Sequence, residues 1–413
     1  MENIKVKGPV IIAMNHPNAF TDPILITSLT HPMKLKFMAR GDVFKPGLIT
    51  SLLESIGIVP IFRIQDGGKE GLKKNEDAYR RVNYLLSKNS KIIVFAEGLC
   101  IQERRLRPLK KGVARMVFGA FEAINNEHLV VVPIGVNYSN PSKLRSNAFY
   151  NIGEPIRVRE FIEAYRNNPA RANRAFMDVL EPRMKALVTH IQNPDDDEAV
   201  LQVETLCKRA ELLKQQLNPT NLEHDFRVLQ QLTEKVNAAS LQNREVLGEF
   251  KTQAKAYFDA LRAHNLRDWL FDPSQNAQSN PIHLVSRCFA LLAGAPIWAL
   301  AMIGNYLPFL LTNYITKKIV KNIEFFSSFY IGIAMIVFLI YYVLCFITLN
   351  VVFASGLLTF LSLFAFGLSA WFSLYYVPFF KKTRGMFVIQ NNKVLVAQLS
   401  SQRNMLLALI NKL

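Results

Sequence analysis

The chain has 413 residues, half of them apolar, and a formal net charge of +17 at pH 7. This length exceeds what one compact core accommodates, so we expect two or three domains. An apolar and basic chain is typical of a protein that binds the lipid bilayer, and without interleaved aromatic residues in its basic runs we expect no nucleic acid partner. Its cysteines are far apart and form no CxxC pair, so neither a disulfide framework nor a zinc site is indicated, and a reducing compartment fits.

Residues 1–193 predict an α/β domain with a mostly parallel sheet flanked by helices. The β-branched runs that read as strands are Pro9–Met14, Leu35–Ala39, Ile58–Phe62, Ile92–Phe95, Val130–Val136 and Ala148–Ile152. Helical patterns lie between them near 46–55, 70–88 and 112–124, and Arg159–Gln192 reads as a helix that closes the domain. The N-terminus has no signal-peptide pattern, so this domain should stay cytosolic.

The first predicted strand ends at Asn15 and His16, and Asp22 follows soon after. Chemistry in α/β folds concentrates where strands end. An imidazole there can accept a proton near neutral pH, and a carboxylate at its other ring nitrogen fixes the tautomer. Because a His and an Asp at this spacing are also frequent by chance, an incidental role stays open for the pair on this pattern alone.

Further polar groups follow later strands. Arg63 comes after the third strand, where it can grip a phosphate or form a surface ion pair. Glu97 and Gly98 follow the fourth strand, and the glycine allows a ligand to approach the backbone. A basic loop comes next, with a helix start near Gly112 that can bind an anion. We interpret its cations as a polyanion site rather than only a solvated loop: Arg104, Arg105, Arg107, Lys110 and Lys111.

Pro133 lies inside the fifth predicted strand, Val130–Val136. Proline inside a strand pattern predicts an edge strand or a bulge, often beside a site, although packing alone explains it equally well.

The region from 194 to 270 is purely helical in pattern. Apolar stripes over 200–217, 222–236 and 246–261 predict three amphipathic helices that form a small bundle. Packing is the favoured role of these stripes, with partner binding as the alternative.

Residues 325–380 carry no charge and are long enough for two membrane-spanning helices, with a turn near Asn350–Gly356. Basic residues flank the run at both ends, so this transmembrane hairpin should have both ends in the cytosol, followed by a cytosolic tail over 381–413. The apolar segment 284–316 is interrupted by Gly, Pro and Asn. There we expect an interfacial or re-entrant pair of short helices, because a full span would separate the basic domain from the lysines before the hairpin.

The order of these blocks resembles the glycerolipid acyltransferase (PlsC-like) superfamily, whose hallmarks are a His-Asp motif, a block ending in Arg, a Phe-Pro-Glu-Gly block and a Val-Pro block. The chain is most similar to the fungal-type glycerol-3-phosphate/dihydroxyacetone-phosphate acyltransferases, through the stretches Leu109–Ala114, Gly135–Tyr138 and Lys143–Ser146. That branch also has membrane segments near the C-terminus. The resemblance covers residues 8–155 and implies a glycerol-3-phosphate acyltransferase-like fold.

The chain departs from the superfamily pattern at three positions. Five residues separate His16 from Asp22 where four are usual, so the motif should be a loop with Asp22 opening a helix, as in the fungal-type branch. Ala96 replaces the usual proline. Leu99 stands where many members have Thr or Ser, so no hydroxyl role is expected there.

The resemblance implies transfer of an acyl chain from acyl-CoA or acyl carrier protein to a phosphorylated glycerol, without metal or other cofactor. It implies that His16 is the general base, that Asp22 orients it, and that Asn15, Arg63, Glu97, Gly98 and the basic loop bind substrate. Three alternatives stay open: a 1-acylglycerol-3-phosphate acyltransferase, a metal-dependent membrane phosphohydrolase using His16, Asp22 and Glu97, and a non-catalytic membrane scaffold.

Overall fold

The computed structural model describes residues 2–413 except 34, 42–46, 48–50, 52–54, 56, 62–63, 144 and 273–280, and it leaves the side chains of 40, 64–74 and 281 undescribed. Contacts divide the chain into two units. Unit 1 comprises Met1–His190 together with Ile323–Ser327, and unit 2 comprises Ile191–Asn322 with Ser328–Leu413.

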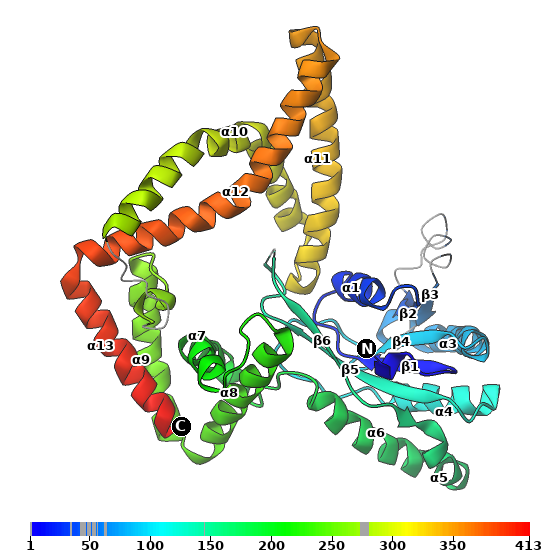
Figure 1. Cartoon of the computed structure of the whole chain (residues 1–413). Helices are drawn as coiled ribbons and strands as arrows, with labels where there is room; N and C mark the ends of the chain where they lie inside the picture. Colours follow the sequence, from blue (N-terminus) through cyan, green and yellow to red (C-terminus); the bar gives the residue numbers. More distant parts are fainter. Residues whose placement is uncertain are drawn as a thin grey trace. The chain divides into compact units, whose positions relative to one another are not determined.

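A mainly parallel sheet forms the centre of unit 1 (Figure 1). Its strands are β1 (Val10–Met14), β2 (Leu35–Arg40), β3 (Ile58–Ile61), β4 (Lys91–Phe95), β5 (Val130–Tyr138), β6 (Ala148–Ile152) and β7 (Ile156–Arg157). The order is β3-β2-β4-β1-β5-β6, with β7 also pairing with β5. The pairs among β1–β5 are parallel, whereas β6 and β7 run antiparallel to β5. The predicted strands and the α/β class are therefore confirmed.

The helices of unit 1 are α1 (Thr21–Thr30), α3 (Ile64–Ser87), α4 (Gly112–Ile124), α5 (Ile162–Asn167) and α6 (Pro169–Lys185), with 3-10 turns at Glu2–Ile4 and Val158–Phe161. The helix predicted near 46–55 falls mostly outside the described residues. The single helix predicted over 159–192 is wrong. Asn168 is extended and caps α6 by accepting from the Arg171 N–H, Pro169 starts α6, and α6 ends at Lys185.

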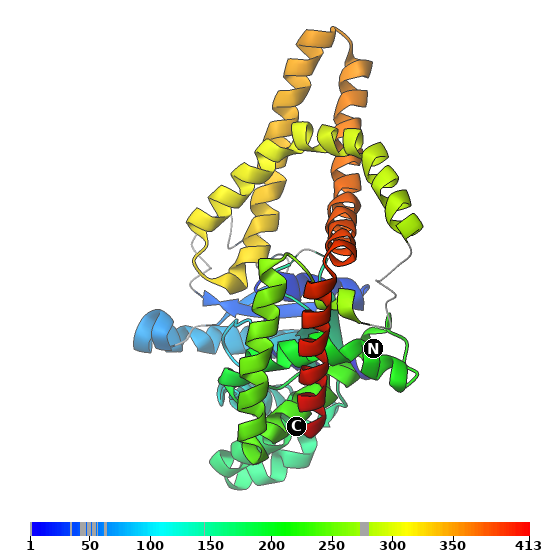
Figure 2. The ribbon, with the colours of Figure 1, turned by 90° about the vertical axis from the view of Figure 1, so that its left-hand side faces the viewer.

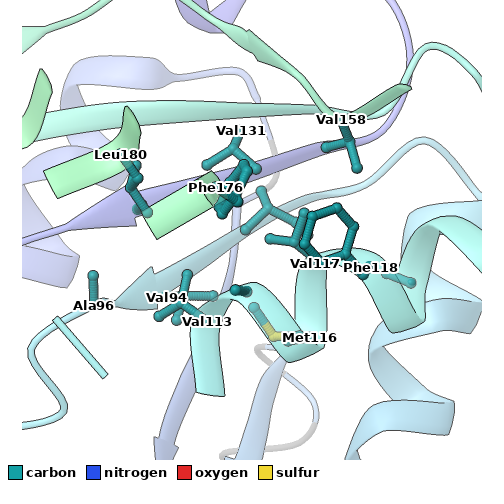
Figure 3. Packing of buried hydrophobic residues seen from close by; sticks show 14 of the residues in the cluster. Val94, Ala96, Val113, Met116, Val117, Phe118, Val131, Val158, Phe176 and Leu180 are labelled. Carbon is teal, nitrogen blue, oxygen red and sulfur yellow. The ribbon is translucent and has the colours of Figure 1, made fainter. Parts of the chain in front are cut away.

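Strand β1 is buried on both faces. Ile11 and Ala13 point into one apolar cluster, and Val10, Ile12 and Met14 point into the other. This alternation follows the two-residue period of a strand. Figure 3 shows the first cluster, where Val94 and Val131 from the sheet pack with residues of α4 and α6. Two-sided burial fixes the end of β1, and with it the position of Asn15 and His16.

Pro133 lies in a strand with partners on both sides, so the expected edge position is wrong. In β5, residues 130–131 pair with β7 and residues 134–138 pair with β6, which leaves the nitrogen of Pro133 at the junction between them. The carbonyl of Pro133 accepts a hydrogen bond from the Gly153 N–H on the same side, at 2.9 Å. The missing N–H of proline therefore removes no bond to β1.

Unit 2 contains a helical bundle formed by α7 (Asp197–Lys214), α8 (Leu222–Gln242) and α9 (Arg244–Ala263), with 3-10 turns at Pro194–Asp196 and Asp268–Phe271. Helix α13 (Lys393–Lys412) joins the same apolar core, which the sequence analysis did not anticipate. Arg403 on α13 forms a buried ion pair with Asp268, 2.9 Å between Nε and Oδ1. The C-terminal helix is thus an integral part of the bundle.

Three helices among the described residues are long and apolar enough to cross a membrane: α10 (Pro281–Ile319), α11 (Ile323–Phe353) and α12 (Gly356–Asn391). Helices α11 and α12 occupy the predicted hairpin and turn at Ala354 and Ser355. The pair of short helices expected over 284–316 is one helix, α10, which contains Pro296 and Pro308.

The first turn of α11 belongs to unit 1. The Ala19 N–H donates to the Glu324 carbonyl at 3.3 Å, and Ser327 Oγ donates to Asn18 Oδ1 at 3.0 Å. Gln102 Nε2 also donates to the Ile323 carbonyl at 3.3 Å. These bonds attach the start of α11 to the loop that carries His16.

Candidate active site

The candidate site lies where β1, β4 and β5 end. Met14 of β1 is in register with Phe95 of β4 and with Ile134 of β5. The residues that follow these three strands therefore meet at one edge of the sheet, where α/β folds place their ligands.

His16 and Asp22 are in direct contact across the loop between β1 and α1. Nδ1 of His16 lies 2.9 Å from Oδ2 of Asp22, which sits in the first turn of α1 and is fully buried. The imidazole stacks on the ring of Phe95, with 3.6 Å between centroids, and retains 14% exposure. An ionised carboxylate only accepts hydrogen bonds, so while Asp22 is ionised Nδ1 carries the proton and the neutral ring has Nε2 as its basic nitrogen.

Three donors surround the Asp22 carboxylate. Besides His16, the Asn18 N–H donates to Oδ2 at 2.8 Å and the Tyr138 phenol donates to Oδ1 at 2.6 Å. Burial raises the pKa of Asp22, and the hydrogen bonds from His16, Tyr138 and Asn18 oppose that rise. Tyr150 Oη donates to the Asp22 backbone carbonyl at 3.3 Å. This arrangement keeps a buried carboxylate fixed beside the imidazole.

Two predicted substrate ligands, Asn15 and Glu97, form hydrogen bonds with backbone groups of the protein. Asn15 Oδ1 accepts from the Val136 N–H at 2.7 Å and its Nδ2 donates to the Val136 carbonyl at 3.1 Å, so its amide extends the pairing of β1 with β5. The buried Glu97 accepts the N–H groups of Arg107 at 2.7 Å and His16 at 3.4 Å. Burial raises the pKa of Glu97, and these amides oppose the rise. Both side chains therefore position loops.

Gly98 has a left-handed backbone with φ of 65°. A Cβ atom there would lie 3.0 Å from the side chain of Lys110. A side chain at this position is strained and displaces Lys110, so the turn after β4 requires glycine.

The basic loop is held at several points beside His16. The Ile101 N–H donates to the His16 carbonyl at 3.1 Å, and the Leu106 N–H donates to His190 Nδ1 at 3.1 Å. Burial, Lys185 and Arg105 lower the pKa of His190 to about 4, so the ring stays neutral and accepts. The loop backbone is thus fixed before any ligand binds.

The cations of this loop differ in their surroundings. Glu103 binds Arg107 through two hydrogen bonds of 2.6 and 3.1 Å, and it lies 3.3 Å from Nε of the largely buried Arg105. Arg104 donates to the Ser139 carbonyl at 3.4 Å, whereas Lys110 and Lys111 are exposed at the start of α4. Glu103 therefore offsets one positive charge of the loop. Its main partner is Arg107, which binds it through two hydrogen bonds.

Arg63 lies outside the described residues. Within the described part of the chain, no group of three His, Cys, Asp or Glu side chains is arranged to hold a metal ion. The carboxylate of Glu97 faces backbone N–H groups, so the three ligands considered for a phosphohydrolase do not converge.

Sequence reasoning missed Tyr138, Tyr150 and Asn18. Tyr138 ends β5, the parallel neighbour of β1, so its proximity to the motif loop follows from the strand order. That order could not be read from the strand pattern alone. Asn18 lies in the His-x-Asn-x-Phe-x-Asp arrangement that the chain shares with the fungal-type branch, but its contacts depend on the course of the loop.

A histidine paired with a buried aspartate lies at the carboxyl edge of this sheet, an arrangement that is able to supply a general base. Residues 1–137 match the family model described as Acyltransferase. This match lies within the N-terminal domain that carries His16 and Asp22.

Curated relatives are fungal proteins. Glycerol-3-phosphate O-acyltransferase 1 of Saccharomyces cerevisiae is 28% identical over 231 residues, which cover 55% of this chain and 29% of that protein. Glycerol-3-phosphate O-acyltransferase 2 of the same yeast is 34% identical over 96 residues, 23% of this chain and 13% of that protein. An uncharacterized acyltransferase of Schizosaccharomyces pombe is 32% identical over 133 residues, 32% of this chain and 19% of that protein. The chain spans less than a third of the length of each relative.

Proposed function

We propose that this protein is a membrane-bound O-acyltransferase of phospholipid biosynthesis. It transfers a fatty acyl chain from acyl-CoA or acyl carrier protein to a hydroxyl of glycerol 3-phosphate or dihydroxyacetone phosphate. The observation that carries this proposal is the contact between His16 Nδ1 and Asp22 Oδ2, 2.9 Å, inside a domain of the acyltransferase family. The names of the two Saccharomyces relatives favour glycerol 3-phosphate.

His16 acts as the general base of the reaction. Nε2 removes the proton of the acceptor hydroxyl while the hydroxyl oxygen attacks the thioester carbonyl carbon. Asp22 stabilises the imidazolium that forms and holds the ring in the required tautomer. The carbon–sulfur bond then breaks, and the departing thiolate takes the proton from His16. The products are an ester and a free thiol, no acyl-enzyme forms, and the imidazole returns to its neutral state.

The basic loop binds the phosphate of the acceptor or the phosphates of the acyl donor. Arg105 is the leading candidate because its guanidinium is largely buried beside the anchored loop backbone. Arg104, Lys110 and Lys111 add positive charge that attracts either substrate. Glu97, Asn15 and Arg107 hold this site in shape. Arg63 keeps the phosphate-binding role that the family resemblance implies.

The membrane helices hold the enzyme at the lipid bilayer, which its amphiphilic product enters. The catalytic domain lies on the cytosolic face. Basic residues on both flanks of the hairpin, among them Lys318 and Lys382, support this orientation.

An acyl-transfer assay of the full chain in membrane vesicles tests the proposal. Vesicles receive acyl-CoA or acylated carrier protein with radiolabelled glycerol 3-phosphate, dihydroxyacetone phosphate or lysophosphatidic acid. We expect His16-dependent labelling of lipid, with glycerol 3-phosphate preferred and EDTA without effect. His31→Ala is the matched control, since His31 also precedes a proline but is exposed. Preference for lysophosphatidic acid would change the acceptor, and equal labelling by His16→Ala would overturn the mechanism.

A further inference from the structure

The start of α10 and the end of α12 lie on the same side of the membrane. Helix α13, which follows α12, packs into one apolar core with α7 and α9, which precede α10. The buried pair of Arg403 on α13 and Asp268 before α10 belongs to that core. A shared core cannot be divided by about 30 Å of hydrocarbon. The segments α10, α11 and α12 therefore cross the membrane an even number of times between them.

The end of α10 is fixed to that same side. Helix α10 ends at Ile319, and the first turn of α11 begins at Ile323 and hydrogen-bonds with the loop at Asn18 and Ala19. Among the described residues before α10, no helix qualifies as a membrane span. The loop at Asn18, the bundle and both ends of α10 thus share one side, and α11 and α12 account for both crossings.

Helix α10 nevertheless penetrates the apolar layer beside α12. Arg287 Nε donates to Thr383 Oγ1 at 3.1 Å near the basic end of α12, and Tyr376 Oη donates to the Leu291 carbonyl at 2.9 Å. Further along, Asn305 Nδ2 donates to the Phe366 carbonyl at 3.0 Å. In these three contacts the residue numbers rise in α10 and fall in α12. Between Arg287 and Asn305, α10 therefore runs antiparallel to α12 and approaches the hairpin turn.

Asn305 marks the deepest part of α10. Its Oδ1 accepts from Tyr342 Oη on α11 at 2.8 Å, so the buried amide joins all three helices. Phe366 and Tyr342 are each ~18 Å from the turn at Ala354 by helix rise, a little more than half the thickness of the hydrocarbon layer. A polar amide at that depth requires internal partners, and both are present.

After Asn305, α10 bends back toward the side of the membrane on which it begins. Figures 1 and 2 show α10 as an arch whose middle is raised above both of its ends. Prolines at 296 and 308 each remove a helix hydrogen bond and permit the bend. Gly304 allows the close approach at the top, since a Cβ atom there would lie 2.5 Å from the Phe366 ring.

We propose that α10 is a re-entrant helix that enters one leaflet of the bilayer, reaches mid-depth at Asn305 and returns to the side from which it came. Its outward face fits the acyl chains of that leaflet, because exposed apolar side chains cover it along its length. They include Ile282, Phe289, Leu292, Ile303, Leu307 and Leu311. The hairpin of α11 and α12 alone crosses the membrane.

Cysteine labelling of sealed vesicles tests the topology. Full-length chains without native cysteines each carry one substitution, His264→Cys, Lys321→Cys, Ser355→Cys or Lys393→Cys. The vesicles are then treated with a membrane-impermeant maleimide. We expect His264, Lys321 and Lys393 to react from one side and Ser355 from the other. Labelling of Lys321 from the side of Ser355 overturns the proposal. A protease site inserted at Lys321 in the chain with native cysteines gives the same discrimination if the cysteine-free chain does not fold.

Nitroxide depth measurements test the penetration of α10. Single cysteines at Ile303, near the top of the arch, and at Val285, near its start, are exposed positions for a spin label. In phosphatidylcholine vesicles, we expect the label at Ile303 to collide with oxygen and to be shielded from a water-soluble nickel chelate. The label at Val285 should be more accessible to the chelate. Equal accessibility of both labels to the chelate contradicts re-entry and describes a helix on the membrane surface.

Discussion

The phenol of Tyr138 donates a hydrogen bond of 2.6 Å to Oδ1 of Asp22, while Oδ2 of the same carboxylate lies 2.9 Å from His16 Nδ1. Each oxygen of Asp22 thus has its own side-chain partner. Tyr138 lies on the sheet and His16 on the loop, so Asp22 links the loop histidine to the end of strand β5.

Tyr138→Phe should change the pH dependence of acyl transfer. The hydrogen bond from Tyr138 opposes the rise in the pKa of Asp22 that burial causes. Without this donor, the pKa of Asp22 therefore rises further. Ionised Asp22 supports the base, so as pH falls kcat/KM should decline from a higher pH than in the parent, with a loss of about tenfold near neutrality. Tyr150→Phe loses a bond to the Asp22 backbone carbonyl and a side-chain hydrogen bond with Tyr138, but no bond to the Asp22 carboxylate, so its acid limb should shift less. An unchanged acid limb in Tyr138→Phe would assign Tyr138 a packing role alone.

His16→Ala and Asp22→Asn should lower kcat by about 10²–10⁴ without impairing membrane insertion. The first removes the proton acceptor, and the second loses the charge that fixes its tautomer. Single-turnover acyl transfer and membrane fractionation provide the measurements, with His31→Ala as the control. Activity of His16→Ala within a few-fold of the parent would refute the base assignment.

Glu97→Gln should impair stability and kcat more than acceptor KM. The substituted amide turns an NH2 group toward one of the two backbone N–H groups that Glu97 now accepts, which costs about 1–3 kcal/mol. Thermal unfolding and steady-state kinetics in detergent test this, with the exposed Glu127→Gln as the matched control. A rise in acceptor KM at unchanged melting temperature would restore Glu97 as a direct substrate ligand.

Arg105→Ala should raise the KM for glycerol 3-phosphate by about tenfold, because a guanidinium–phosphate contact is charge-assisted. Arg107→Ala should act mainly through the loop, since Arg107 is engaged by Glu103. Initial rates over a range of acceptor concentrations separate the two effects. Equal changes in KM for both variants would mean that the loop acts only through its summed charge.

Arg403→Met should destabilise unit 2 by about 3–5 kcal/mol, because it leaves the buried Asp268 carboxylate without its ion-pair partner. The exposed pair of Arg262 and Asp259 offers the control, and Arg262→Met should leave thermal unfolding unchanged. Unfolding of Arg403→Met at the parent temperature would show that this ion pair adds nothing to the stability of the bundle.

The sequence analysis predicted the strands of unit 1 because two-sided burial leaves continuous apolar runs such as Val10–Met14. The pairing of His16 with Asp22 came from the His-Asp motif of the resembled superfamily, because the residue pattern alone left an incidental role open. The contacts of Asn15 and Glu97 with backbone groups depend on which strands are neighbours, and no local pattern carries that information. The sequence pattern did not show that α13 joins the bundle, because the helices it packs against lie more than a hundred residues earlier in the chain.

The hydrogen bond between Ser327 and Asn18 joins residues 309 positions apart. During synthesis from the N-terminus, the loop that carries His16 therefore exists long before its partners on α11. Those partners are the first turn of the helix that opens the transmembrane hairpin, so the loop acquires its last support only as the hairpin is made. A chain that stops before Ile323 contains every predicted catalytic residue but lacks the turn that holds their loop.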